Sequence, residues 1–266
     1  MSGEEQLYVY QDAKNDATLT PIGSDQLIEG HLAVADSWLV ENGRVRNLAA
    51  HYERFKNWAQ DVIPKLELDG FFDSVTALIP KTESWFPRIE LLVSANSDAH
   101  QLVVRLREAP EREATITLWN FNEPDPRVSP TVKGPDLSLG LQMRRAAQMH
   151  GADEAVLLST DGYVLEGALS ALVWFRDDVL CAPSDELPWL PSITRSEVFA
   201  IAESMGISTR NEKVKPADLV GLEIWSLSSL HGIRSVQDWI DLGGPVGTAR
   251  HLDSFNKRLR MLSASL

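Results

Sequence analysis

The chain has 266 residues, of which 44% are hydrophobic and 24% are charged, and both shares are ordinary for a globular protein. At roughly 150 residues per domain, it fits one large domain or two small ones, which fold without disulfides or metals. Its formal charge of −13, from 25 Lys+Arg against 38 Asp+Glu, disfavours nucleic-acid and anionic-membrane partners. Cys181 is the single cysteine, and neither a signal core nor a bilayer-spanning run is visible. We therefore expect a soluble, cytoplasmic protein.

The N-terminal half has the pattern of an α/β unit. Alternating residues on both sides of Asn42-Gly43 predict a tight hairpin over residues 36–46. Helical spacing predicts one helix over 48–62, and a second is expected over 71–79. Three apolar runs then predict consecutive strands of an antiparallel meander, over residues 88–95, 101–108 and 114–121.

A polar, proline-rich stretch, NFNEPDPRVSPTVKGP, separates the two halves of the chain. Each proline removes a backbone donor and fixes φ, so regular structure is not expected there. The sequence therefore predicts a small N-terminal domain over residues 1–121, an interdomain linker over 122–132 and a larger C-terminal domain over 133–266.

The C-terminal half is rich in strands with interspersed helices. Asp161-Gly162 predicts a hairpin turn within residues 154–167, and Asp177-Asp178 predicts another within 171–183. A short strand is expected over 223–229, followed by an irregular to extended segment over 231–242. The predicted helices cover residues 137–151, 194–206 and 249–262, the first two closed by glycines. This pattern favours an α+β or barrel-like arrangement.

Several familiar site types are absent from the sequence. It has no CxxC or HExxH metal spacing, no GxGxxG, no Walker loop and no GxSxG elbow, so no metal site is expected. The remaining polar residues are individually ordinary. Taken one at a time, Lys133 and Arg54 are typical of solvated surface charges, and Glu166 is typical of a hairpin carboxylate. The spacing of Thr194 and Glu197 is typical of a capping box at a helix N-terminus.

Taken together, these residues match the needs of pyridoxal phosphate. A lysine binds its aldehyde, a carboxylate holds its pyridine nitrogen protonated, and an arginine with a helix N-terminus holds its phosphate. Their order along the chain supports this interpretation, through the stretches Lys133-Gly-Pro-Asp, Asp161-Gly-Tyr-Val-Leu-Glu166-Gly, Pro191-Ser-Ile-Thr-Arg195, Glu223-Ile-Trp-Ser-Leu-Ser-Ser-Leu-His-Gly-Ile-Arg234 and His51-Tyr-Glu-Arg54-Phe.

In these stretches the chain resembles the fold-type IV pyridoxal-phosphate enzymes, the family of class IV aminotransferases and aminodeoxychorismate lyases. The resemblance covers residues 30–240 and implies a two-domain, D-amino-acid-aminotransferase-like α+β fold, with a small α/β N-terminal domain and a larger barrel-like C-terminal one. It also implies a homodimer. By the same resemblance Lys133 is the Schiff-base lysine and proton carrier, and Glu166 pairs with the pyridine nitrogen. The implied phosphate ligands are Arg54, Ile193, Thr194 and Ser229.

The resemblance is incomplete where substrate would be recognised. The family's usual Ser-Asn is Ser170-Ala171 here, and its Gly-Ile-Thr is Ser192-Ile193-Thr194. The Ser-Leu-His-Gly-Ile-Arg234 stretch is more similar to lyases than to transaminases, so we favour 4-amino-4-deoxychorismate lyase, which forms p-aminobenzoate and pyruvate. A transaminase for branched-chain or D-amino acids is the alternative, and a non-catalytic binding protein is a further one. Candidates for receiving substrate carboxylates are Arg105, Arg107 and Arg234.

Overall fold

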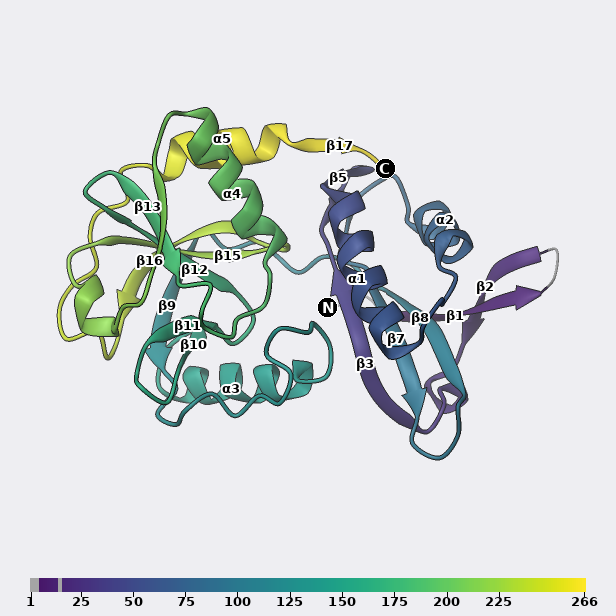
Figure 1. Cartoon of the computed structure of the whole chain (residues 1–266). Coiled ribbons are helices and arrows are strands. Elements are labelled where there is room, and N and C mark those ends of the chain that lie inside the picture. The colour runs from purple at the N-terminus through teal and green to yellow at the C-terminus, as the bar shows by residue number, and fades with distance from the viewer. Residues whose placement is uncertain (1–4, 14–15) are drawn as a thin grey trace. The chain divides into compact units, whose positions relative to one another are not determined.

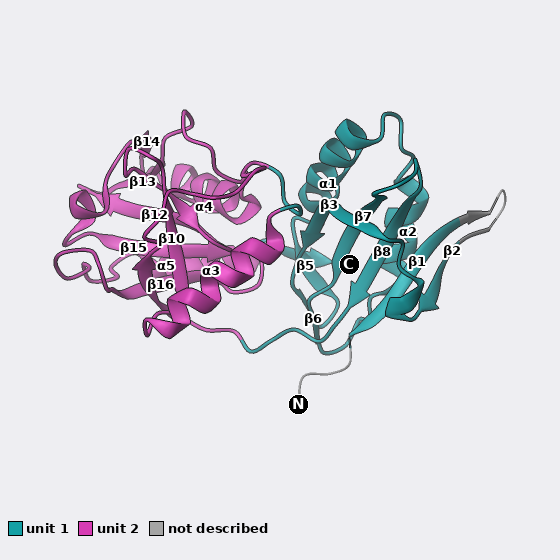
Figure 2. Ribbon diagram, turned by 90° about the horizontal axis from the view of Figure 1, so that it is seen from below, with its two compact units in different colours: residues 1–111, 132–135, 262–266 teal, residues 112–131, 136–261 magenta. Residues whose placement is uncertain are grey.

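The computed structural model describes residues 5–13 and 16–266, which divide into two compact units (Figure 2). Unit 1 consists of residues 1–111, 132–135 and 262–266, and unit 2 of residues 112–131 and 136–261. The chain therefore passes from one unit to the other several times. Residues 122–131 of the predicted linker belong to unit 2, whereas Lys133 belongs to unit 1.

Unit 1 is built on a five-stranded antiparallel sheet in the order β2-β1-β8-β7-β3. Helix α1 packs on β3 and α2 on β2, and the core between them contains Phe55, Phe71 and Trp38. A second, four-stranded sheet has the order β17-β5-β4-β6. The elements are β1 (Gln6–Ala13), β2 (Asp16–Ile22), η1 (Ser24–Gln26), β3 (Gly30–Ser37), β4 (Val40–Glu41), β5 (Arg44–Arg46), α1 (Leu48–Val62), α2 (Asp69–Leu78), β6 (Ser84–Trp85), β7 (Arg88–Ser94), β8 (His100–Leu106) and β17 (Ser263–Ser265).

Unit 2 is built on a curled eight-stranded sheet in the order β11-β10-β9-β16-β15-β12-β13-β14. Helices α4 and α5 pack together against β12, β15 and β16, and α3 packs against β9 and β10 (Figure 1). Separate apolar clusters lie under the α4–α5 pair and under α3. The elements are β9 (Thr115–Asn120), α3 (Leu137–Met149), β10 (Glu154–Leu158), β11 (Val164–Gly167), β12 (Ala171–Arg176), β13 (Val179–Pro183), α4 (Ile193–Ser204), β14 (Thr209–Glu212), η2 (Pro216–Leu219), β15 (Glu223–Ser228), β16 (Gly232–Trp239) and α5 (Leu252–Met261).

The local predictions based on turns and helical periodicity are confirmed. Helix α1 has the predicted bounds, and Asn42 and Gly43 both have positive φ in the tight turn between β4 and β5. Gly162 and Asp177 also have positive φ, at the two predicted hairpin turns of unit 2. Gly151 and Gly206 follow α3 and α4 with positive φ, as the predicted helix ends require.

One long-range prediction is wrong. Strand β9 does not continue the meander of unit 1, because it pairs in parallel with β10 and β16 in the sheet of unit 2. This error concerns pairing partners distant in sequence, which local patterns do not specify. The segment predicted to be irregular to extended contains strand β16, which is hydrogen-bonded to both β9 and β15 and has an irregular register between Val236 and Asp238.

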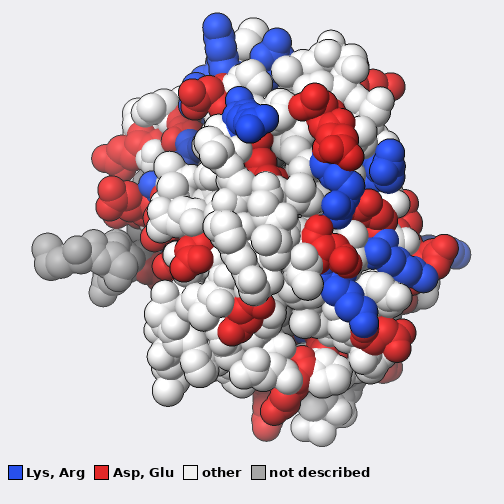
Figure 3. Space-filling view, turned by 90° about the vertical axis from the view of Figure 1, so that its left-hand side faces the viewer, with Lys and Arg blue, Asp and Glu red and all other residues white. Residues whose placement is uncertain are grey.

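The surface drawn in Figure 3 carries acidic and basic side chains interleaved around a broad area of uncharged residues. No helix in residues 5–13 and 16–266 is both long enough and apolar enough to cross a membrane.

Candidate functional site

In unit 1, a buried carboxylate connects strand β3 to helix α1. Asp36 has no exposed surface, and its Oδ1 accepts a 2.8 Å hydrogen bond from Nδ1 of His51 and another from Nη2 of Arg54. Nε of Arg54 donates to Oδ2 at 2.8 Å, so the arginine holds both oxygens. Burial opposes ionisation, but Arg54 and His51 hold the pKa of Asp36 well below its usual value. Arg54 therefore lies in a buried ion pair rather than on a simple solvated helix face.

Lys133 lies beside strand β3 in the same unit. Its carbonyl oxygen accepts a 2.7 Å hydrogen bond from the amide of Ala35, next to Asp36. Gly134 follows with φ of +143°, and a Cβ there would stand 2.9 Å from the Cα of Val34, so this close approach needs glycine. Burial lowers the pKa of His51, and the charge of Lys133 contributes in the same direction. The structure thus places Lys133 near the group of Asp36, His51 and Arg54.

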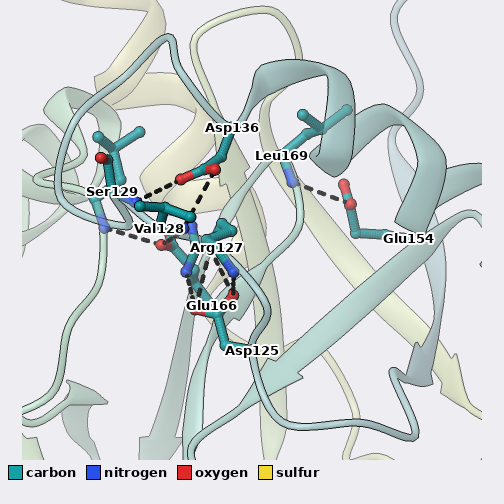
Figure 4. A network of polar contacts seen from close by, with 9 residues as sticks. Asp125, Arg127, Val128, Ser129, Asp136, Glu154, Glu166 and Leu169 are labelled. Carbon is teal, nitrogen blue, oxygen red and sulfur yellow. Dashed lines mark hydrogen bonds and ion pairs between the residues drawn. The ribbon is translucent and has the colours of Figure 1, made fainter.

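In unit 2, Glu166 lies on β11 inside a polar network (Figure 4). It is 4% exposed, and its Oε1 accepts hydrogen bonds from Nη1 of Arg127 at 2.8 Å and from the amide of Leu190 at 2.9 Å. Among the described residues, none donates a hydrogen bond to Oε2. Burial raises the pKa of Glu166 to about 7, against the opposing effect of Arg127. Glu166 is therefore a buried acceptor with one oxygen available.

The N-terminus of α4 has the two residues predicted as phosphate ligands at its first two positions. Ile193 is 8% and Thr194 1% exposed, and the backbone amides at these positions have no partner within a helix. The helix cap is Ser192, whose Oγ accepts from the amide of Arg195, so the predicted capping box beginning at Thr194 is wrong. An anion can bind at such a helix end. Ser229 belongs to the turn between β15 and β16 in the same unit.

The arginines considered for substrate carboxylates have different surroundings. Arg105 donates from Nε to Glu90 at 2.8 Å, and Arg107 donates to the carbonyl of Phe86 at 3.0 Å. Both lie partly exposed in unit 1, with Arg88 directly opposite Arg105 on the neighbouring strand. Arg234 of unit 2 is only 3% exposed and pairs with Glu113 at 3.3 Å. Of these three arginines, only Arg105 and Arg107 keep side-chain surface for an incoming anion.

Glu154 on β10 gives a testable pH dependence. It is 2% exposed, 3.9 Å from Nη2 of Arg234, and burial raises its pKa to about 7. The native state then binds more protons than the unfolded state between about pH 4.5 and pH 7, so stability falls as pH rises through this window. We expect Glu154→Gln to make the fall in Tm over this range shallower. An unchanged slope in thermal unfolding scans of the variant would contradict the assignment.

Two functional candidates were not visible in the sequence. Arg127 lies in the proline-rich stretch, where no periodicity indicates that its side chain is buried. Asp36 lies at the start of the predicted hairpin over residues 36–46, and its ion pair with Arg54 joins residues on a strand and a helix. Neither a charged residue between prolines nor a single acidic residue in a predicted hairpin identifies its ionic partner.

Comparison with known proteins places this fold among characterised enzymes. Residues 33–239 match the family described as amino-transferase class IV. The chain is 30% identical over 100 residues to a branched-chain-amino-acid aminotransferase of Escherichia coli, covering 38% of this chain and 32% of that protein. It is 31% identical over 101 residues to a bifunctional aminodeoxychorismate lyase / D-amino acid transaminase of Mycobacterium tuberculosis, covering 35% of each. The chain thus matches about a third of the length of each of these two relatives.

The similarity in fold extends over nearly the whole chain. The PLP-bound form of a hypothetical aminotransferase from Mycobacterium tuberculosis superposes with a TM-score of 0.80, covering 97% of this chain and 98% of that one at 18% identity. At this identity the likeness describes the fold alone.

Proposed function

The chain belongs to the class IV aminotransferase family, whose members are pyridoxal-phosphate enzymes, and we propose that it is a 4-amino-4-deoxychorismate lyase. The observation that carries the cofactor assignment is the buried carboxylate of Glu166, with both hydrogen bonds on Oε1 and none from described residues on Oε2. A pyridine nitrogen requires such an acceptor. The fold and the order of the candidate residues support the same assignment.

The donor groups of this chain fit the cofactor's other parts. We assign its phosphate to Arg54, Ser229 and the first-turn amides of Ile193 and Thr194, because a guanidinium, a hydroxyl and helix amides all donate to anions. Glu166 would face the pyridine nitrogen, and Lys133 would hold the aldehyde carbon through Nζ. When bound, the cofactor supplies an electron sink for negative charge that develops on the substrate carbon.

In this proposal Lys133 also moves the proton. Its amine would take the proton from the amine-bearing carbon of the substrate, acting as a general base. Loss of pyruvate then leaves an aromatic ring, which supplies the driving force. The two products, p-aminobenzoate and pyruvate, together contain all atoms of the substrate, so the reaction needs no oxidant. Arg105 and Arg107, with Arg88 beside them, are the proposed receivers of substrate carboxylates.

The choice of the lyase is supported by the Ser-Leu-His-Gly-Ile-Arg234 stretch, which covers the turn after β15 and the start of β16 and is similar to that of lyases. A class IV aminotransferase acting on branched-chain or D-amino acids is the second candidate. It is favoured by the 30% identity to a branched-chain-amino-acid aminotransferase over 100 residues. Both reactions use the same lysine and electron sink, so the substrate decides between them.

Two assays on the protein reconstituted with pyridoxal phosphate separate these candidates. For the lyase, we expect aminodeoxychorismate to yield equal amounts of p-aminobenzoate, followed by fluorescence, and pyruvate, followed with lactate dehydrogenase. We also expect L- and D-amino acids to leave the visible absorption band of the bound cofactor in place. Conversion of that band by branched-chain or D-amino acids, without products from aminodeoxychorismate, would contradict the lyase and support the aminotransferase.

The proposal also includes a cytoplasmic homodimer, as the family resemblance implies. Sedimentation equilibrium of the purified chain should give about twice the mass of 29.6 kDa. A species of single-chain mass at micromolar concentration would contradict the dimer.

A further inference from the structure

Arg127 is a buried cation to which the function described above assigns no role. Its side chain is 7% exposed and lies between two carboxylates, those of Asp125 and Glu166, which are 9% and 6% exposed (Figure 4). A guanidinium is expensive to bury without partners, so its position is set by the groups that pair with it.

Asp125 fixes the orientation of the guanidinium. Nε of Arg127 donates to both oxygens of Asp125, at 3.0 and 3.1 Å, and Nη2 donates to Oδ2 at 2.8 Å. The amide of Asp125 itself donates to the carbonyl of Leu158 at the end of β10. Beyond Arg127, Asp136 accepts from the amides of Val128 and Ser129. The segment is therefore anchored on both sides of Arg127.

Asp125 accepts from Nε and Nη2 of Arg127, and the remaining nitrogen, Nη1, donates to Glu166. The 2.8 Å bond goes to Oε1, the same oxygen that accepts from the amide of Leu190. The carboxylate is thereby held in one orientation, with its positive partner on the side of Oε1. A nearby positive charge favours the ionised form of a carboxyl group.

We propose that Arg127 is a positioning residue that keeps Glu166 ionised and presents its Oε2, so that the proton shared with the cofactor's pyridine nitrogen rests on the nitrogen. This inference rests on the proposed role of Glu166 toward pyridoxal phosphate. Burial alone would favour a neutral carboxyl, which would leave the ring nitrogen unprotonated and weaken the electron sink. Arg127 supplies a positive charge that opposes this preference.

The test uses the ring-nitrogen resonance of ¹⁵N-labelled pyridoxal 5′-phosphate bound to the full-length protein. We expect the unaltered protein to show a protonated nitrogen at pH 7.5. Arg127→Gln keeps donors but loses the charge, so the ratio of protonated to unprotonated nitrogen should fall at least about tenfold. Arg127→Lys should restore it. In Glu166→Gln, adding Arg127→Gln should cause no further change, since the arginine acts through the glutamate.

Arg176→Met is the matched control. Arg176 also pairs with a carboxylate in unit 2, because its Nε donates to Glu212 at 3.1 Å. Its Nη2 donates to the carbonyl of Asp218, so its described hydrogen bonds are to groups other than Glu166. We expect the nitrogen of this variant to remain protonated. Should Arg127→Gln fail to fold, an unprotonated nitrogen in folded Arg127→Lys would overturn the inference, because the charge is retained there.

Two results separate the inference from the function on which it rests. If Arg127→Gln binds the cofactor with its nitrogen protonated as in the unaltered protein, Arg127 does not act on Glu166 in this way. If the unaltered protein binds no pyridoxal phosphate, the proposed function itself fails.

Discussion

Replacing Lys133 with alanine is expected to abolish product formation and the visible absorption band of the bound cofactor. The variant loses both the covalent attachment of the cofactor and the base that moves the substrate proton. Positioned proton transfer alone contributes about 10² to 10⁴ in rate, so we expect kcat to fall by at least about 10³. The measurements are p-aminobenzoate release under single-turnover conditions and the absorption spectrum after dialysis.

Lys257→Ala is the control for this prediction. Lys257 lies on α5 and is exposed, so its removal should change neither the spectrum nor the rate. Because only the side chain of residue 133 changes, the turn at Gly134 and the bond from Ala35 should persist in Lys133→Ala, with a Tm close to that of the unaltered protein. Activity within tenfold of the unaltered protein would remove Lys133 from its proposed role.

The second large effect is expected at Asp36. Asp36→Ala leaves the guanidinium of Arg54 without its bidentate partner and His51 without its acceptor, in a site with no exposed carboxylate surface. Removing one partner of a buried ion pair typically costs about 3 to 5 kcal/mol. We expect a loss of this size in the free energy of unfolding, measured by urea denaturation with tryptophan fluorescence. Affinity for pyridoxal phosphate should also fall, because Arg54 loses its orientation.

The pH dependence of this loss follows from the lowered pKa of Asp36. The pKa of the Asp36 carboxyl is about 4 in the unfolded chain and lower in the native protein. The stabilisation by Asp36 is therefore present in full above about pH 5 and is lost as pH falls toward the native pKa. The unaltered protein should therefore be more stable than Asp36→Ala from about pH 5 to 8, and this difference should shrink below about pH 4.

Asp69→Ala is the matched control for Asp36. Asp69 forms a 3.2 Å ion pair with Lys56 in the same unit, but its side chain is 82% exposed. Exposed pairs contribute little, so the denaturation midpoint should not move measurably. Equal effects of the two substitutions would contradict the importance of the buried group.

The parts of the fold that could be predicted are the turns and helices that short segments of sequence specify. Asn42-Gly43 and Asp161-Gly162 specify turns because few residues adopt positive φ at low cost, and the spacing of Phe55 and Ala59 specifies the buried face of α1. Strand β9 looks locally like its predecessors in the sequence. Its placement depends on pairing with β10 and β16, and such long-range pairing leaves no local mark.

The candidate site divides in the same way. Lys133, Glu166 and Thr194 could be proposed from the sequence because their order and spacing resemble those of a known family. The ionic partners of Arg54 and Glu166 could not be proposed in this way. Asp36 is 18 positions from Arg54, and Arg127 is 39 positions from Glu166. These partners depend on the tertiary fold, which places a strand residue against a helix and a loop residue against a strand.

The central claim is that Lys133 carries pyridoxal phosphate, and chemical trapping tests it most directly. The reconstituted protein is reduced with borohydride, which makes the bond between the lysine and the cofactor permanent, and is then digested and mapped by mass spectrometry. We predict a pyridoxyl group on the peptide containing Lys133, in stoichiometric amount. Labelling of a different lysine, or no labelling at saturating cofactor, would contradict the account.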